Sequence, residues 1–351
     1  MTSRRSFLAG AAALSLLPRA TWADAGSPRY LAAAKDAQGA FALHGLSAAG
    51  ASLFALPLPG RGHAACAHPQ RPAAVAFARR PGSFALVLNA LTGAETARLT
   101  PPEGRQFNGH GVFDAGGEVL MTSEVIAETS EGRIGLWDAR DWRRIGEWAT
   151  GGIGPHDIKR LGEGLVVANG GIQTDPQDRT KLNIETMAPS LTYLAADGTI
   201  AEQIRLDPDL AQDSIRHLAL LPDGTVAFAM QWEGDPALPV PLLGLHKRGG
   251  AVVLAEVPEA EEAVMQGYAG SIAVAGGRVA ISSPRGGAVM VFGADGRWQA
   301  THRRADVCGL APLGEDFLVT DGLGGIGRLD RAGLTMLSTH AQAWDNHLIA
   351  L

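Results

Sequence analysis

The stretch His110-Gly-Val-Phe-Asp-Ala-Gly-Gly-Glu-Val-Leu-Met-Thr-Ser-Glu124 contains the pattern that decides the fold of this 351-residue chain. A polar residue opens an alternating apolar segment, a glycine-containing turn follows, and a second apolar segment ends in a polar residue. Alternation with a period of two is typical of β-strands, and two such segments joined by a short turn predict a β-hairpin.

The same pattern recurs along the chain. Further copies open at His156, His217, Ser271 and Cys308, a looser copy opens at Ala74, and His347 opens a single terminal strand. The intervals between openings are 36, 46, 61, 54, 37 and 39 residues. Because propeller blades recur at roughly 40–50 residues, we predict an all-β, seven-bladed β-propeller. A sandwich with a small second domain would explain the density of strands, but not the thirteen to fourteen residues between the two polar ends of each hairpin.

The terminal strand at residues 347–351 has no partner in its own neighbourhood. Three apolar runs near the start of the chain, at residues 30–34, 40–44 and 52–57, would complete a blade with it. Closing the ring in this way removes the unpaired edges of an open array. We therefore predict that N-terminal strands pair with the C-terminal strand.

The first 25 residues have the features of an export signal. Ser3-Arg4-Arg5-Ser6-Phe7-Leu8 resembles the twin-arginine consensus, residues 7–17 are apolar, and Ala23-Asp24-Ala25 has the form of a peptidase site. We predict a signal peptide over residues 1–25, one propeller domain over residues 26–351, and a periplasmic protein without a membrane span after signal removal. An uncleaved N-terminal anchor is the alternative.

The composition agrees with many tight turns and limits the partners. Glycine occurs 45 times, and 30 basic residues face 36 acidic ones without any basic run, so we expect no nucleic-acid partner. The two cysteines, Cys66 and Cys308, could form one bridge or remain thiols.

Histidine occupies four of the seven opening positions. These are His110, His156, His217 and His347, whereas Ala74, Ser271 and Cys308 occupy the other three. In a propeller the first strand of each blade lines the central channel, so equivalent positions form a ring. Several neutral imidazoles that face one point suit Zn, Cu, Fe or Ni.

We therefore predict a transition-metal site, with iron or copper as the metal. Its candidate ligands are His110, His156, His217, His347, Glu124 and Cys308. A purely structural polar channel and a protonated ring that attracts anions are the alternatives. The remaining histidines, His63 and His68 among them, fall outside the repeat position, and we expect them to lie on the surface or in loops.

Six segments resemble a bacterial family of twin-arginine-exported proteins, the domain-of-unknown-function family fifteen-thirteen. They are Arg79-Arg80-Pro81-Gly82, Gly109-His110-Gly111-Val112-Phe113, Gly152-Ile153-Gly154-Pro155-His156, Ser214-Ile215-Arg216-His217-Leu218, Ser283-Pro284-Arg285-Gly286-Gly287 and Trp344-Asp345-Asn346-His347. The resemblance implies a seven-bladed propeller similar to quinoprotein amine dehydrogenases and YVTN-type propellers. It also implies an association with imelysin-type periplasmic proteins, and hence with iron acquisition. Asp157 stands where the family is expected to carry a longer Glu.

The resemblance brings no established activity, so three functions remain open. The first is a metal-binding protein that works with other periplasmic iron-uptake proteins. The second is a metal-dependent oxidase or hydrolase that uses the same site. The third is an interaction scaffold with structural histidines.

Overall fold

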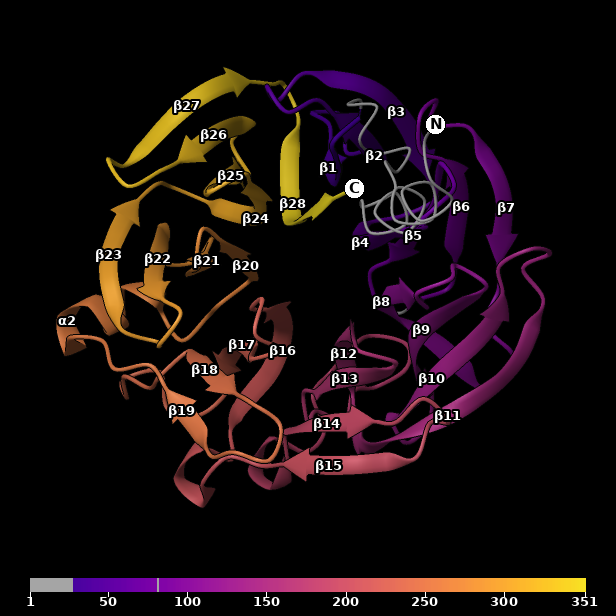
Figure 1. Ribbon diagram of the computed structural model, residues 1–351. Helices are drawn as coiled ribbons and strands as arrows, with labels where there is room; N and C mark the ends of the chain where they lie inside the picture. The colour runs from indigo at the N-terminus through magenta and orange to yellow at the C-terminus, as the bar shows by residue number, and fades with distance from the viewer. Residues whose placement is uncertain (1–27, 81) are drawn as a thin grey trace, which may run out of the picture.

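Seven four-stranded antiparallel sheets surround a common axis in the computed structural model, which describes residues 28–80 and 82–351 (Figure 1). The chain is therefore an all-β, seven-bladed propeller, as the repeat predicted. The predicted signal peptide at residues 1–25 lies outside the described residues. Among the described residues, no helix has the length and apolar character needed to cross a membrane.

Each blade is one sheet, numbered here in the order of the chain. Blade 1 contains β28 (Ala343–Ala350), β1 (Tyr30–Lys35), β2 (Phe41–Leu46) and β3 (Ser52–Leu58). Blade 2 contains β4 (Gly62–Ala67), β5 (Ala73–Ala78), β6 (Ala85–Asn89) and β7 (Glu95–Leu99). Blade 3 contains β8 (Arg105–Phe113), β9 (Val119–Ile126), β10 (Glu131–Asp138) and β11 (Arg144–Ile153). Blade 4 contains β12 (Pro155–Leu161), β13 (Gly164–Asn169), β14 (Ser190–Leu194) and β15 (Ile200–Ile204).

The remaining blades have the same plan. Blade 5 contains β16 (Asp213–Leu220), β17 (Val226–Trp232), β18 (Leu243–His246) and β19 (Val252–Leu254). Blade 6 contains β20 (Ser271–Ala275), β21 (Arg278–Ser283), β22 (Ala288–Gly293) and β23 (Trp298–Arg303). Blade 7 contains β24 (Val307–Leu313), β25 (Asp316–Asp321), β26 (Gly325–Leu329) and β27 (Leu334–Thr339). Short helical segments connect some strands: α2 (Glu259–Glu262) and the 3₁₀ turns η2 (Ile184–Thr186), η3 (Pro208–Leu210) and η4 (Ala263–Met265).

The ring closes where the two ends of the chain meet. Strand β28 pairs antiparallel with β1, in a register that places Tyr30 opposite Ala350 and Ala32 opposite Leu348. Figure 1 shows β28 next to β1, on the side of blade 1 that faces the axis. The predicted closure by N- and C-terminal strands is confirmed.

The apolar core is divided among the interfaces between blades. Each of seven clusters of buried side chains among the described residues joins two neighbouring blades, so every interface of the ring has its own core. The cluster that contains Cys308, Ile326, Trp344 and Leu348 joins blade 7 to blade 1. Packing as well as β-pairing therefore closes the ring.

The strand assignment predicted for blade 2 is wrong by one strand. Ala74 lies on β5, the second strand, whereas the inner strand β4 carries His63. Strand β4 consists largely of small residues, and a loop containing Pro69 and Pro72 follows it in place of a glycine turn, so its pattern differs from the other copies. The spacing was nevertheless informative, since the 47 residues from His63 to His110 match the 46 from His110 to His156.

Removal of the last five residues tests the closure. This deletion should expose the edge of β1 and cause aggregation. A milder change, Leu348→Ala, should lower the free energy of unfolding by about 2–5 kcal/mol, because Leu348 is buried in the cluster that joins blades 7 and 1. Size-exclusion chromatography and urea unfolding measure both effects.

The matched control is Leu337→Ala on the outer strand β27, where Leu337 is 44% exposed. It should change the free energy of unfolding by no more than about 0.5 kcal/mol. Equal losses for Leu348→Ala and Leu337→Ala would contradict the structural role of the closing strand.

Candidate metal centre

Five histidines from five consecutive blades meet at the axis. They are His347 on β28, His63 on β4, His110 on β8, His156 on β12 and His217 on β16. The ring centroid of His63 lies 4.9 Å from that of His110, 5.1 Å from that of His156 and 4.3 Å from that of His347. The ring of His217 lies 4.7 Å from that of His156. Of the four predicted channel histidines, His110, His156 and His347 thus converge with His63, and His217 lies beside them.

Four of these imidazoles could hold one metal ion. The ligand atoms of His63, His110, His156 and His347 all lie within 4.8 Å of one another. The Nε2 atom of His63 is 3.3 Å from Nε2 of His156 and 3.3 Å from Nε2 of His347. In a tetrahedral site with metal–nitrogen bonds of about 2.0–2.1 Å, neighbouring nitrogens are about 3.3 Å apart. The spacing of these two nitrogen pairs therefore fits a tetrahedral metal centre.

Hydrogen bonding alone does not account for this arrangement. A neutral imidazole nitrogen offers either one hydrogen or one lone pair, yet Nε2 of His63 faces two other ring nitrogens. In addition, Nε2 of His110, another of these four histidines, is buried and has no hydrogen-bond partner among the described residues. Buried polar groups in purely structural sites normally have partners, so the donor set fits a metal better than a structural polar channel.

Local irregularities in the inner strands aim the imidazoles at the axis. The register between the inner strand and its neighbour shifts around His63, His110 and His156, between Gly62 and Ala65, Phe107 and Gly111, and Pro155 and Ile158 respectively. A β-bulge turns a side chain out of the regular alternation. A comparable shift also occurs around Cys308 on β24, whereas strand β20, which carries Ser271, has none.

Asp157 orients one of the candidate ligands. Its Oδ1 lies 3.2 Å from Nδ1 of His110, and its Oδ2 accepts a hydrogen bond from the backbone N–H of Leu218 at 2.9 Å. Burial would raise the pKa of Asp157, but Lys159 and His110 hold it well below its ordinary value. The ionised carboxylate fixes Nδ1 of His110 as the donor and leaves Nε2 for a metal, an arrangement common around metal-binding histidines.

The imidazoles are held in the neutral form that metals require. Burial lowers the pKa of His63, His156, His217 and His347 well below the ordinary value, and positively charged neighbours and the other imidazoles lower it further. Burial also lowers the pKa of His110, although Asp157 opposes this effect. A protonated ring that attracts anions, one of the alternatives considered for the sequence, therefore receives no support.

Two predicted ligands are engaged elsewhere. The Glu124 carboxylate is fully buried and pairs with Arg144 at 2.8 Å, because the second strand β9 carries it away from the axis. Cys308 has a free thiol, as Cys66 does, and its Sγ lies 3.5 Å from the carbonyl oxygens of Thr320 and Trp344. Burial raises the pKa of Cys308 to about 12, so the thiolate that a metal needs is disfavoured.

His63, and not His217, is the fourth candidate ligand. His217 lies beside the cluster, 4.9 Å from the His347 ring centroid, but is not one of the four histidines whose ligand atoms converge. His63, expected on the surface or in a loop, is one of them. Its ring is accommodated by Gly109, since a Cβ at that position would overlap the His63 ring and the Gly109 φ is +97°.

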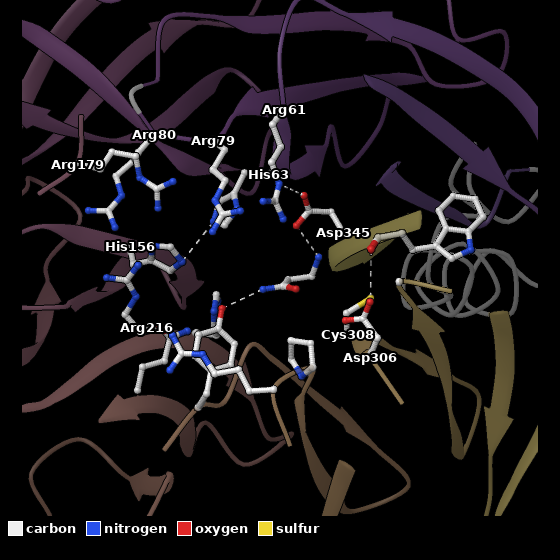
Figure 2. A pocket seen from close by; sticks show the side chains of 18 of the residues that line it. Arg61, His63, Arg79, Arg80, His156, Arg179, Arg216, Asp306, Cys308 and Asp345 are labelled. Atoms are coloured by element: carbon white, nitrogen blue, oxygen red, sulfur yellow. Dashed lines mark hydrogen bonds and ion pairs between the residues drawn. The ribbon is translucent and has the colours of Figure 1, made fainter. Parts of the chain in front are cut away.

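A cavity of about 700 Å3 opens beside the cluster, and His63, His156 and His217 form part of its wall. Figure 2 shows Arg79, Arg80 and Arg179 gathered on the same side of this cavity, next to His156. Cys308, Gln231 and Arg285 also line it. The histidines are therefore reachable from a space large enough for a small organic molecule.

Residues 56–351 match the family model described as "Protein of unknown function (DUF1513)". The chain belongs to this family. The match covers the complete blades 2 to 7, the closing strand β28 and all five axial histidines, so the resemblance stated for the sequence is confirmed at the level of family and fold. No curated protein matches this DUF1513 chain in sequence.

Solved structures similar to this DUF1513 chain share its fold at low sequence identity. A chain of Kuenenia stuttgartiensis hydrazine synthase is 12% identical with a TM-score of 0.60, and the alignment covers 93% of this chain and 99% of that one. The WD40 repeats of RRP9 are 12% identical with a TM-score of 0.58, covering 79% and 80%. U3-55K is 13% identical with a TM-score of 0.56, covering 79% and 81%. These similarities support the propeller fold alone.

The pH dependence of stability tests the neutral cluster in metal-free protein. Because the folded-state pKa of each clustered histidine is depressed, the unfolded chain binds more protons below its own histidine pKa near ~6.5. Stability should therefore be constant above about pH 7 and fall on acidification, by up to about 1.4 kcal/mol per pH unit for each histidine. Urea unfolding from pH 5 to 8 with a chelator present measures the slope.

The variant His110→Gln/His156→Gln should show a shallower slope, whereas His340→Gln, outside the cluster, should keep the slope of the wild type. A wild-type slope that is unchanged in the double variant would show that other groups cause the acid sensitivity.

The close approach of Gly109 to His63 gives a second test. Gly109→Ala should displace the His63 ring, whereas Gly104→Ala meets nothing within 4 Å at a similar positive φ of +72°. Both changes carry the backbone cost of about 1–2 kcal/mol for a left-handed residue, and Gly109→Ala should cost more. Histidine ring NMR resonances and urea unfolding compare the two variants; identical spectra would contradict the contact.

Proposed function

We propose that this protein binds a transition metal, iron or copper, through His63, His110, His156 and His347, and that it acts in the periplasm in iron acquisition. The observation that carries the metal site is the convergence of four imidazoles from four blades on one point. The twin-arginine-like segment Ser3–Leu8 supports the periplasmic location. Support for the iron-acquisition setting, and for periplasmic iron-uptake proteins as partners, comes from the family resemblance alone.

The donor set determines which metals fit. Four neutral nitrogen donors without a carboxylate suit Cu, Zn, Ni and Fe(II) and disfavour Ca²⁺ and Mg²⁺, which take oxygen ligands. Asp157 supplies a negative charge that contacts a candidate ligand, His110. Its ionised form would increase the basicity of that imidazole and offset part of the charge of a bound cation.

An enzyme that uses the same centre is the second candidate. It is favoured by the cavity of about 700 Å3, which reaches His63, His156 and His217. A substrate in this space would lie beside the metal. Metal-dependent turnover would then accompany metal binding, whereas a scaffold with structural histidines would show neither.

Metal analysis of the purified protein tests the proposal. Protein without a His tag, isolated from the periplasm, should carry close to one iron or copper per chain. After removal of the metal by chelation, added Fe(II) or Cu(II) should raise the melting temperature, because a ligand in hundredfold excess over its Kd stabilises the folded state by about 2.7 kcal/mol.

The double variant His63→Ala/His156→Ala should lose both the bound metal and the shift in melting temperature while remaining folded, since the cores between the blades do not contain these side chains. The control His302→Ala, on the outer strand β23, should behave as wild type. Metal-insensitive melting in all three proteins would refute the metal site and favour the scaffold. Stoichiometric zinc in place of iron or copper would refute the metal assignment while leaving the site.

A further inference from the structure

The cavity beside the histidine cluster carries a large excess of positive charge. Eight basic side chains and three acidic ones line it. The acidic groups are partly used, because Asp345 pairs with Arg61 at 2.5 Å and Glu233 pairs with Lys181. Arg79, Arg80, Arg179 and Arg216 have no ion pair with an acidic side chain among the described residues.

Arg216 is the member of this group whose burial most strongly indicates a ligand. It is only 7% exposed, it lines the cavity, and its Nε has no hydrogen-bond partner among the described residues. A buried, unpaired guanidinium is costly unless a ligand compensates it. It lies on β16, and its side chain lines the same cavity as His63, His156 and His217.

The other free arginines increase this cost. Burial lowers the pKa of Arg80 well below its ordinary value, and Arg216, Arg179 and Arg79 lower it further. Figure 2 shows the Arg79, Arg80 and Arg179 side chains close to one another. Glu233 and Asp345 offset this repulsion only in part, and a cluster of cations with too few acidic neighbours is the electrostatic signature of an anion-binding site.

We infer that this cavity binds a small organic acid with two or more carboxylate groups, held by Arg79, Arg80, Arg179 and Arg216. Guanidinium groups bind carboxylates through paired, charge-assisted hydrogen bonds. The four arginines come from three separate parts of the chain: the two residues after β5, the segment between β13 and β14, and the inner strand β16.

The size and layout of the site select the class of ligand. A volume of about 700 Å3 lies in the range of small-molecule sites and is far larger than a single inorganic anion needs. Arginines that approach from separate segments can bind separated anionic groups at the same time. A molecule with several carboxylates matches this layout, whereas acetate or phosphate would engage one part of it.

This inference does not depend on the proposed metal function. The four arginines are distinct from the candidate metal ligands, so anion binding can be measured on metal-free protein. If a metal is bound as well, each ligand would offset the charge that disfavours the other, and the two affinities would rise together.

Isothermal titration calorimetry on the metal-free, full-length mature protein tests the inference. The probe is propane-1,2,3-tricarboxylate, compared with acetate, inorganic phosphate, pyrophosphate and the uncharged triamide of the same acid. We expect saturable one-to-one binding of the tricarboxylate alone, accompanied by an increase in melting temperature. No saturable binding would overturn the inference. Equal or tighter binding of acetate, phosphate or pyrophosphate would overturn the assignment to polycarboxylates.

Three variants locate the binding site. Arg216→Gln and Arg179→Gln should each weaken tricarboxylate binding by at least about tenfold, the loss expected for one charge-assisted hydrogen bond. Arg179 is exposed, so its variant gives a result even if Arg216→Gln fails to fold. The control Arg297→Gln, whose side chain is 88% exposed and is not part of the cavity lining, should bind as wild type. Unchanged affinity in Arg179→Gln together with unchanged affinity or misfolding in Arg216→Gln would overturn the assignment.

Discussion

The antiparallel pairing of β28 with β1 is the constraint on which the remaining structure depends. A propeller blade cannot shield both its faces alone, and each of the seven cores in this protein lies between two blades. Only when the ends of the chain pair does blade 1 acquire its inner strand and blade 7 its second neighbour. The same pairing brings His347 to the axis, 284 residues along the chain from His63. Fold closure and site assembly are therefore consequences of one set of backbone hydrogen bonds.

The sequence predicted the blades and most of the axial histidines because both depend on a local pattern. Each hairpin repeats an apolar alternation that begins with the same kind of position, so His110, His156, His217 and His347 could be recognised as equivalent. The repeat pattern did not identify His63, because the hairpin of blade 2 lacks the glycine turn and its inner strand is nearly all small residues. The second strand of this blade was therefore assigned as its first, and Ala74 was assigned to the opening position that His63 occupies.

The details of coordination depend on features that no local pattern records. Bulges around His110 and His156 set the direction of the rings, and Gly109 makes room for the ring of a different blade. Glu124 illustrates the reverse case, since its position in the repeat suggested the channel but Arg144 of the same blade binds it. The arginines of the cavity come from parts of the chain between residues 61 and 285, and only the folded ring shows that they share one space.

The placement of the histidines also has a mechanical consequence. His347 lies on the last strand of the chain, whereas His63, His110 and His156 lie on the inner strands of the next three blades. An ion coordinated by all four would tie the C-terminal strand to three blades to which it has no backbone pairing. Peeling that strand away from β1 would then require breaking a metal–nitrogen bond as well as the hydrogen bonds of the sheet. The bound ion would therefore stabilise the closed ring against separation of β28 from β1. Opening of the ring would in turn release the ion, so the lifetime of the closed ring and the retention of the ion would be linked.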